Sequence, residues 1–294
     1  MAWRFALMID PVASDDEVGD VASTLRPIDP TAPALQLGDL SAQRGDGVFE
    51  SIGVVDGHPH EVGPHLERLA HSASLCDLPA PDLAQWRAAV ERVCAEAGPG
   101  ESVIKLILSR GVEGGPTPTA WVTLATAPDN AAARRDGVRV VTLDRGYPLD
   151  VPARAPWLLL GAKTLSYAVN MAAIREAKRR GADDAVFVTT DGFVLEAPTA
   201  SVLLRIDGRF VTPAPSAGIL HGTTQLSVFA HLEQRGLATA YENVPVADLE
   251  RADAAWLLSS VRLAAPISAV DGRPLSVDHA LTDELNGFLL GRRG

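Results

Sequence analysis

The sequence predicts an α+β protein with two domains. The chain has 294 residues, which is enough for two hydrophobic cores. Segments with the alternation of strands and segments with the periodicity of helices occur in both halves. A small, polar stretch, "APDNAAARRDG" (127–137), lies between two expected strands and is typical of an interdomain linker. We therefore expect a small N-terminal domain over 1–126 and a larger C-terminal domain over 138–294.

The N-terminal half contains four expected strands and two expected helices. The strands are predicted at 4–9, 47–55, 102–109 and 119–126. The "DG" at 56–57 predicts a hairpin turn after the second of them. Apolar residues at helical spacing predict a helix over 64–75, and a second helix over 83–98 is expected to end at Gly98. The N-terminal domain should therefore combine a sheet with helices.

The C-terminal half repeats this mixture. The expected elements are strands at 138–143, 156–162 ("PWLLLGA") and 254–261, and helices at 166–180, 222–236 and 278–290. Central Asp-Gly pairs predict hairpins in "AVFVTTDGFVLEA" (185–197) and "SVLLRIDGRFVTP" (201–213). Gly181 is expected to end the helix at 166–180, whose last turn is basic and suits the negative end of the helix.

Composition and charge favour a soluble globular protein that does not bind nucleic acid. The chain is 47% hydrophobic and 21% charged, as ordinary soluble domains are. Its net charge of -11 leaves no basic surplus to neutralise nucleic-acid phosphates, although a small anion needs only a few local donors. No apolar run approaches the roughly 20 residues that span a bilayer. We expect neither nucleic acid nor membrane as a partner.

The N-terminus, the cysteines and the histidines carry weaker signals. The apolar run in "MAWRFALMID" is short and Asp10 closes it, so no secretory signal is expected. Cys76 and Cys94 are interpreted as reduced thiols of a cytoplasmic protein. The stretch "DGHPHEVGPH" (56–65) holds three histidines, but it is interpreted as a polar loop after a hairpin rather than as a metal site. We expect no metal.

Lys163 is a cation in an unusual place. It follows the apolar run at 156–162 and precedes the helix expected at 166–180, away from the other bases of this region. The residues alone leave two interpretations open. A lysine at the end of a strand commonly extends its amine to water, and a lysine in a dry cleft is a nucleophile whose amine is easily deprotonated.

Three further features favour the second interpretation. Glu196 closes an apolar run, where a carboxylate lies at a sheet rim or is paired. A Pro/Gly loop leads into a helix whose first turn carries Thr223 and Thr224, and a helix N-terminus with hydroxyls suits a phosphate. Ser259 and Ser260 either supply hydroxyls to the same anion or simply end the last strand. A lysine, a carboxylate and a phosphate site are together what pyridoxal phosphate needs.

Six motifs occur in a fixed order along the chain. They are "RGDGVFES" (44–51), "HLERL" (65–69), "AKTLSYAVNMAA" (162–173), "VLEAPTAS" (194–201), "LHGTTQ" (220–225) and "LLSSV" (257–261). In combination they resemble the class IV, fold type IV, pyridoxal-phosphate enzymes, which include branched-chain and D-amino-acid aminotransferases and 4-amino-4-deoxychorismate lyase. The resemblance implies a small and a large domain with the cofactor between them, and a homodimer.

The resemblance also implies a role for each matching residue. Lys163 matches the lysine that bonds covalently to the cofactor aldehyde, and Glu196 matches the carboxylate at the pyridine nitrogen. The residues expected at the cofactor phosphate are Arg68, Thr223, Thr224 and Ser260. Tyr167, four residues after the lysine, either faces the phenolic oxygen of the cofactor or packs in the core. Arg110 and Arg262 each follow a strand, and each is a candidate ligand for a substrate carboxylate or a solvated surface arginine.

The motif set looks most similar to actinobacterial sequences of aminodeoxychorismate lyases and class IV aminotransferases. The Gly-Asn-Tyr motif of branched-chain transaminases is absent after the lysine, while Gln225 and Ser201 replace a common arginine and asparagine. We expect a lyase that releases pyruvate and 4-aminobenzoate in folate biosynthesis. The alternative is an aminotransferase acting on branched-chain or D-amino acids with 2-oxoglutarate. A non-catalytic relative is disfavoured by the intact Lys163–Glu196 pair.

Overall fold

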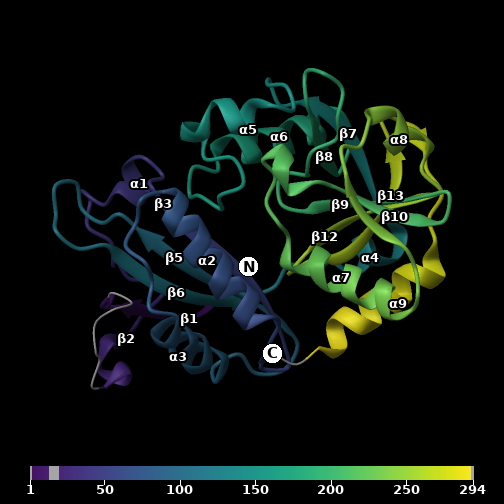
Figure 1. Cartoon of the computed structure of the whole chain (residues 1–294). Coiled ribbons are helices and arrows are strands. Elements are labelled where there is room, and N and C mark those ends of the chain that lie inside the picture. Colours follow the sequence, from purple (N-terminus) through teal and green to yellow (C-terminus); the bar gives the residue numbers. More distant parts are fainter. Residues whose placement is uncertain (1, 13–19, 293–294) are drawn as a thin grey trace. The chain divides into compact units, whose positions relative to one another are not determined.

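The computed structural model describes residues 2–12 and 20–292, which form two compact units. The first unit comprises Met1–Pro128, Ala162–Tyr167 and Arg292–Gly294, and the second comprises Asp129–Gly161 and Ala168–Gly291. Each unit contains its own sheet and its own helices (Figure 1), so the predicted α+β class is confirmed. No helix in the described part of the chain is long and apolar enough to cross a membrane.

Two segments fall in units that differ from the expected domain ranges. Residues 131–136, inside the expected linker, form helix α4 (Ala131–Asp136) of the second unit. Ala162–Tyr167 belong to the first unit because their backbone pairs with strand β3 (Gly47–Val55). The N–H of Phe49 donates to the carbonyl of Lys163 at 3.0 Å, and the N–H of Leu165 donates to the carbonyl of Gly47 at 2.8 Å.

The first unit is a six-stranded antiparallel sheet with two main helices. Its strand order is β2-β1-β6-β5-β3-β4. The strands are β1 (Trp3–Ile9), β2 (Leu25–Ile28), β3, β4 (His58–Pro59), β5 (Glu101–Ser109) and β6 (Thr119–Thr126). The main helices are α2 (Val62–Leu75) and α3 (Leu83–Cys94), and the short ones are η1 (Val21–Thr24) and α1 (Leu40–Gln43). The four predicted strands and both predicted helices are present, although α3 ends four residues before Gly98.

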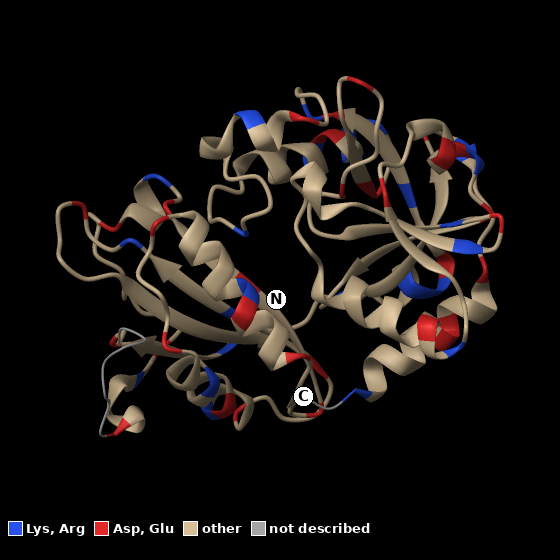
Figure 2. Ribbon diagram, in the orientation of Figure 1, with Lys and Arg blue, Asp and Glu red and all other residues tan. Residues whose placement is uncertain are grey.

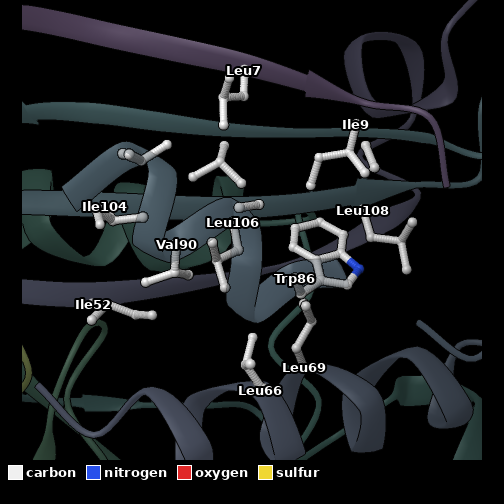
Figure 3. Packing of buried hydrophobic residues seen from close by; sticks show 14 of the residues in the cluster. Leu7, Ile9, Ile52, Leu66, Leu69, Trp86, Val90, Ile104, Leu106 and Leu108 are labelled. Carbon is white, nitrogen blue, oxygen red and sulfur yellow. The ribbon is translucent and has the colours of Figure 1, made fainter. Parts of the chain in front are cut away.

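Alternation along the strands produces the core of the first unit. In β5, Ile104, Leu106 and Leu108 point to the same face and pack with α2 and α3. Figure 3 shows this arrangement, with Leu66 and Leu69 of α2 directed toward the strands and the ring of Trp86 among them. Each large side chain removed from water stabilises the unit by roughly 1.5–3 kcal/mol, so this face fixes where α2 lies on the sheet.

The second unit is built on a mixed eight-stranded sheet. Its order is β11-β10-β9-β12-β13-β7-β8, and β14 pairs with β13. The strands are β7 (Val138–Asp144), β8 (Asp184–Val188), β9 (Ser201–Ile206), β10 (Arg209–Pro213), β11 (Thr239–Glu242), β12 (Ala254–Ser259), β13 (Leu263–Val270) and β14 (Arg273–Pro274). Its helices are α4, α5 (Val151–Arg154), η2 (Pro156–Leu158), α6 (Ala168–Arg179), η3 (Pro215–Ala217), α7 (Thr223–Gln234), α8 (Val246–Arg251) and α9 (His279–Gly291).

The sheet of the second unit is buried on both faces. Trp256 and Leu258 pack with helices α7 and α9, whereas Leu257, between them, packs with α8 on the other face. Figure 2 shows acidic and basic residues interspersed along the ribbons of both units. The predicted hairpin at 201–213 is formed by β9 and β10, with Asp207 and Gly208 at positive φ in the turn.

The prediction of a strand at 156–162 is wrong. Pro156–Leu158 form the short helix η2, Leu159 has a left-handed backbone with φ 53°, and Trp157 is 75% exposed. The apolar run has the composition of a strand, but Pro156 and Gly161 interrupt its backbone. The hairpin predicted at 185–197 is formed in part: β8 is a strand, and the second arm pairs with it through hydrogen bonds from Phe187 N–H to the Glu196 carbonyl and from Leu195 N–H to the Phe187 carbonyl.

The helix predicted at 166–180 is α6, and Gly181 ends it as expected. Gly181 has φ 76°, a conformation that costs glycine little and other residues more. Its N–H donates to the carbonyl of Lys178 at 3.1 Å, and the N–H of Ala182 donates to the carbonyl of Ala177 at 2.9 Å. This pattern is a Schellman motif, which satisfies two of the last carbonyls of the helix.

Candidate active site

Lys163 lies in the first unit, beside the beginning of strand β3. Its carbonyl accepts the N–H of Phe49, and its own N–H donates to the hydroxyl of Ser72 on α2 at 3.1 Å. Its Nζ is 4.3 Å from the ring centre of Phe49 and 5.8 Å from that of Tyr167, and the two rings meet edge to face. Both polar groups of the Lys163 backbone are therefore fixed, and the amine lies against aromatic faces that attract a cation.

Arg68 is held by a buried ionic network on the same strand and helix. Its Nε and Nη2 donate to the two carboxylate oxygens of Glu50 at 2.7 and 2.8 Å. The Nδ1 of His65 donates to Glu50 at 2.8 Å. The side chains of Glu50 and His65 are 0% exposed and that of Arg68 is 12% exposed. Sequence reasoning identified Arg68 and missed Glu50.

The network sets the protonation of its members. Burial by itself would raise the pKa of Glu50, but the charge and hydrogen bonds of Arg68, with help from His65, hold this pKa well below its usual range. Burial lowers the pKa of His65, which the Glu50 carboxylate opposes and the charges of Arg68 and Lys163 reinforce. These directions favour the anionic form of Glu50 and the neutral form of His65, and the hydrogen bond to the Glu50 carboxylate favours the proton of a neutral His65 on Nδ1.

Three hydroxyls converge at the start of helix α7 in the second unit. Thr223 and Thr224, the first two residues of the helix, are almost fully buried. Their hydroxyl oxygens lie 3.3 and 3.4 Å from the hydroxyl of Ser260, just after strand β12. The first N–H groups of an α-helix have no partner within the helix, and its N-terminus carries partial positive charge. The arrangement suits an anion with several oxygens.

Gly222 brings this helix start close to Ser201. A Cβ at position 222 would lie 2.3 Å from the hydroxyl oxygen of Ser201, so any larger residue would require the Ser201 side chain to move. Gly222 is also the N-cap residue of α7, and its φ of -73° is one that any residue adopts. The requirement for glycine is therefore one of space rather than of backbone conformation.

Glu196 lies beside an apolar cluster of the second unit. One of its carboxylate oxygens accepts the N–H of Leu220 at 3.1 Å. Its chain neighbour Leu195 packs with Ile219 and with the partly buried Tyr147. Burial raises the pKa of Tyr147, a hydrogen bond from Arg145 lowers it, and the charge of Glu196 raises it. Sequence reasoning missed Tyr147, since nothing in its neighbourhood in the sequence points to Glu196.

The two arginines proposed as carboxylate ligands differ in their partners. Arg110 donates to both oxygens of Asp46, at 2.7 and 3.2 Å, and to the carbonyls of Cys76 and Asp77. Arg262 donates from Nη1 to the nearly buried Asp184 at 2.8 Å. Its Nε and Nη2 are buried, and no described residue accepts a hydrogen bond from them. Arg262 thus retains donor capacity, whereas the guanidinium of Arg110 is engaged on all sides.

The predicted residues thus form one group in each unit. In the first unit Lys163, Tyr167 and Arg68 lie along β3 and α2, while Arg110 pairs with Asp46. In the second unit, three of the predicted residues meet at the α7 start: Thr223, Thr224 and Ser260. Glu196 is held by the N–H of Leu220, which lies two residues before Gly222 in the chain.

Comparison with known proteins identifies the family. The model of the amino-transferase class IV family matches residues 47–270. The chain belongs to the class IV aminotransferases. It is 47% identical over 260 residues to the bifunctional aminodeoxychorismate lyase/D-amino acid transaminase of Mycobacterium tuberculosis, covering 84% of this chain and 90% of that protein.

Solved structures of class IV enzymes share the fold over nearly the whole chain. The fold IV transaminase CpuTA1 of Curtobacterium pusillum has a TM-score of 0.93 and 49% identity, covering 98% of this chain and 99% of that one. A hypothetical aminotransferase of Mycobacterium tuberculosis in its PLP-bound form has a TM-score of 0.86 and 42% identity, with 97% of each chain covered. Its form with α-ketoglutarate and PMP has 0.87 and 43%, covering 97% and 100%.

Pyridoxal 5′-phosphate is the cofactor of this class IV enzyme, and the donor set of the chain fits it. A lysine amine in the first unit suits the aldehyde. The helix start with three hydroxyls suits the phosphate, and the carboxylate of Glu196 suits a protonated ring nitrogen.

Proposed function

We propose that this enzyme is a 4-amino-4-deoxychorismate lyase that releases pyruvate and 4-aminobenzoate. The observation that carries the proposal is the 47% identity, over 90% of its length, to a relative whose name includes this activity. The absence of the Gly-Asn-Tyr motif after Lys163 also disfavours a branched-chain transaminase.

Lys163 is proposed as the residue that binds the cofactor covalently and moves the proton. The bound cofactor supplies an aldehyde for the substrate amine and an electron sink for the charge left on carbon. The amine of Lys163, displaced by the substrate amine, takes the proton from the adjacent carbon and afterwards serves as a proton donor. The rings of Phe49 and Tyr167 restrict where this amine can lie.

Glu196 is proposed to keep the pyridine nitrogen protonated. A carboxylate beside a ring nitrogen stabilises its protonated form, and the hydrogen bond from Leu220 N–H fixes one oxygen of Glu196. The residues proposed to bind the phosphate are Arg68, Thr223, Thr224 and Ser260. A charge-assisted hydrogen bond of the Arg68 kind contributes about 1.5–3 kcal/mol.

Arg262 is the stronger of the two proposed ligands for a substrate carboxylate. Buried donors without acceptors cost about 1–3 kcal/mol, a cost that a carboxylate would remove. Arg110 would have to exchange Asp46 for the substrate. Arg110 stays a candidate ligand, but its binding of a substrate carboxylate would require the loss of its ion pair with Asp46.

D-Amino-acid transamination is the second candidate function. The name of the same relative includes a D-amino acid transaminase, and a similar structure contains α-ketoglutarate and PMP. Both reactions begin with the same proton abstraction, so one chain can perform both.

The fate of the cofactor separates the two reactions. The holoenzyme is incubated with 4-amino-4-deoxychorismate and no keto acid. A lyase is expected to release many equivalents of pyruvate and 4-aminobenzoate per site and to stay yellow. A transaminase without a keto acid stops after one half-reaction with its cofactor in the amine form. The lyase proposal fails if no more than one equivalent of pyruvate appears, while D-alanine with 2-oxoglutarate supports rapid turnover.

We also propose that the enzyme is a homodimer. In the second unit, Trp157 is 75% exposed and Val169 is 57% exposed, and large apolar side chains of this kind commonly pack in an interface. Light scattering is expected to give twice the chain mass of 31.0 kDa.

A further inference from the structure

Glu50 is a carboxylate in a row of core residues. Strand β3 turns Val48, Ile52 and Val54 toward the core of the first unit, and alternation places Glu50 in the same row. Its side chain is 0% exposed. A buried carboxylate costs free energy unless it is paired and hydrogen-bonded, so the surrounding residues have to supply its partners.

Glu50 links β3 to helix α2 through three hydrogen bonds. Two come from the guanidinium of Arg68 in a parallel, bidentate arrangement, and the third comes from His65. A bidentate pair fixes the plane of the guanidinium as well as its position. Arg68 is therefore oriented by Glu50 rather than by packing alone.

The same strand and helix also hold Lys163. The neighbour of Glu50 on the strand, Phe49, donates its N–H to the carbonyl of Lys163 at 3.0 Å. One turn beyond Arg68 on the helix, Ser72 accepts the N–H of Lys163 at 3.1 Å. A link between β3 and α2 thus fixes Arg68 relative to the backbone of Lys163.

We propose that Glu50 is a positioning residue for the cofactor phosphate. It orients the guanidinium of Arg68 for binding the phosphate and keeps it at a fixed position relative to Lys163. The proposal rests on the proposed role of Arg68 as a phosphate ligand. Glu50 acts through Arg68 and does not itself contact the cofactor.

A carboxylate near a phosphate also has an effect of opposite sign. Its charge repels the phosphate, so removal of that charge alone would strengthen phosphate binding. An arginine that is no longer held must lose side-chain freedom when it binds the phosphate, which weakens binding. The sign of the change therefore separates positioning from plain electrostatics.

The test compares two ligands that differ only in the phosphate. Apo-protein is titrated with pyridoxal phosphate and with pyridoxal, and the absorbance of each ligand attached to Lys163 reports binding. We expect Glu50→Gln to weaken binding of pyridoxal phosphate by roughly tenfold, as expected for one released arginine, and to change binding of pyridoxal by less than about twofold. In the Arg68→Ala background, Glu50→Gln should cause no further weakening, because no arginine remains to be positioned.

Asp39→Asn is the matched control. Asp39 is a buried carboxylate of the same unit, and it bonds to Ser41 and Ser109 instead of to an arginine. Its variant should leave the ratio of the two affinities as in the wild type. If Glu50→Gln does not fold, Glu50→Asp replaces it, because it keeps the charge and withdraws the carboxylate from Arg68, and the same direction of change is expected.

The outcomes separate this inference from the proposal on which it rests. Unchanged affinity for pyridoxal phosphate in Arg68→Ala would remove Arg68 from the phosphate site and this inference with it. A second outcome would overturn the positioning role of Glu50 alone. In it, Arg68→Ala binds pyridoxal phosphate more weakly, while Glu50→Gln leaves unchanged or raises the affinity for pyridoxal phosphate relative to that for pyridoxal. Equal weakening for both ligands in Glu50→Gln would also overturn the positioning role, since that result reports general loss of structure.

Discussion

In the first unit the groups proposed to bind ligand are charged side chains, and other ionisable or aromatic side chains hold them. Arg68 is fixed by the buried Glu50, and the amine of Lys163 lies against Phe49. In the second unit the corresponding groups at the α7 start are neutral hydroxyls, and the main chain places them. Thr223 belongs to the first turn of α7, and Gly222 allows that turn to approach β9.

The difference indicates how each unit should respond to change. A charged ligand group needs a counterion, so the first unit should be sensitive to the removal of charge and to pH. A hydroxyl at a helix start needs only the path of the backbone, so the α7 start should be sensitive to added volume.

Lys163→Ala should abolish turnover. It removes both the covalent link to the cofactor and the general base, so the loss should exceed the roughly 10²–10⁴-fold that acid–base help alone provides. Pyruvate release measures activity, and borohydride bleaching of the yellow holoenzyme measures attachment. The matched control is Lys178→Ala in the last turn of α6, which should keep both colour and activity. Near-normal turnover by Lys163→Ala would contradict the assignment.

Gly222→Ala should damage the phosphate site through shape alone. The new Cβ would meet the hydroxyl oxygen of Ser201 at 2.3 Å, and overpacking of this kind typically costs about 1–3 kcal/mol. We expect binding of pyridoxal phosphate to weaken by roughly tenfold or more, on the scale of about 1.4 kcal/mol per tenfold. Adding Ser201→Ala removes the hydroxyl oxygen and should restore part of the affinity. Absence of any restoration would show that the contact with Ser201 is not the cause.

The sequence predicted the α7 start correctly but not the structural surroundings of Lys163. The helix start was predictable because its hydroxyls are contiguous with a Pro/Gly loop, and the hydroxyl of Ser260 does lie beside those of Thr223 and Thr224. Lys163 was predicted to end a strand, and this prediction is wrong. The apolar run before it forms no strand and has no buried face, and Trp157 is largely exposed. The true setting of Lys163 depends on pairing with β3, more than 100 residues earlier, which no local pattern contains.

Glu50 was missed although a signal for it exists. The alternating row that begins with Val48 and ends with Val54 places a carboxylate at a position that should face the core. A charge at such a position predicts a buried partner. That Arg68 is the partner required the packing of α2 on the sheet, and this comes from the core contacts of Leu66 and Leu69.

Arg262→Gln should raise KM more than Arg110→Gln. Arg262 has two buried donors that no described residue accepts, whereas Arg110 is engaged by Asp46 and by two carbonyls. Loss of one carboxylate contact of about 1.5 kcal/mol predicts a rise in KM of roughly tenfold for Arg262→Gln and little change for Arg110→Gln. Steady-state kinetics with 4-amino-4-deoxychorismate measures both. A larger rise for Arg110→Gln would reverse the assignment of the two arginines.

Acid should destabilise the first unit through His65 and then through Glu50. Burial lowers the pKa of His65 from its ordinary 6.5, so the unfolded chain binds this proton more readily than the folded chain. Arg68 and His65 hold the pKa of Glu50 below its ordinary 4.5 against the opposing effect of burial, with the same consequence. Stability from His65 is therefore present above about pH 6.5 and is lost as the pH falls below it, and stability from Glu50 is lost below about pH 4.5.

One group changes the free energy of unfolding by at most about 1.36 kcal/mol per pH unit. Urea unfolding of the apo-protein between pH 7.5 and pH 5 measures it, before Glu50 begins to titrate. His65→Gln keeps a hydrogen-bond donor for Glu50 but cannot titrate, so its free energy of unfolding should fall less steeply with decreasing pH. Equal slopes in the wild type and His65→Gln would show that His65 does not couple protons to folding.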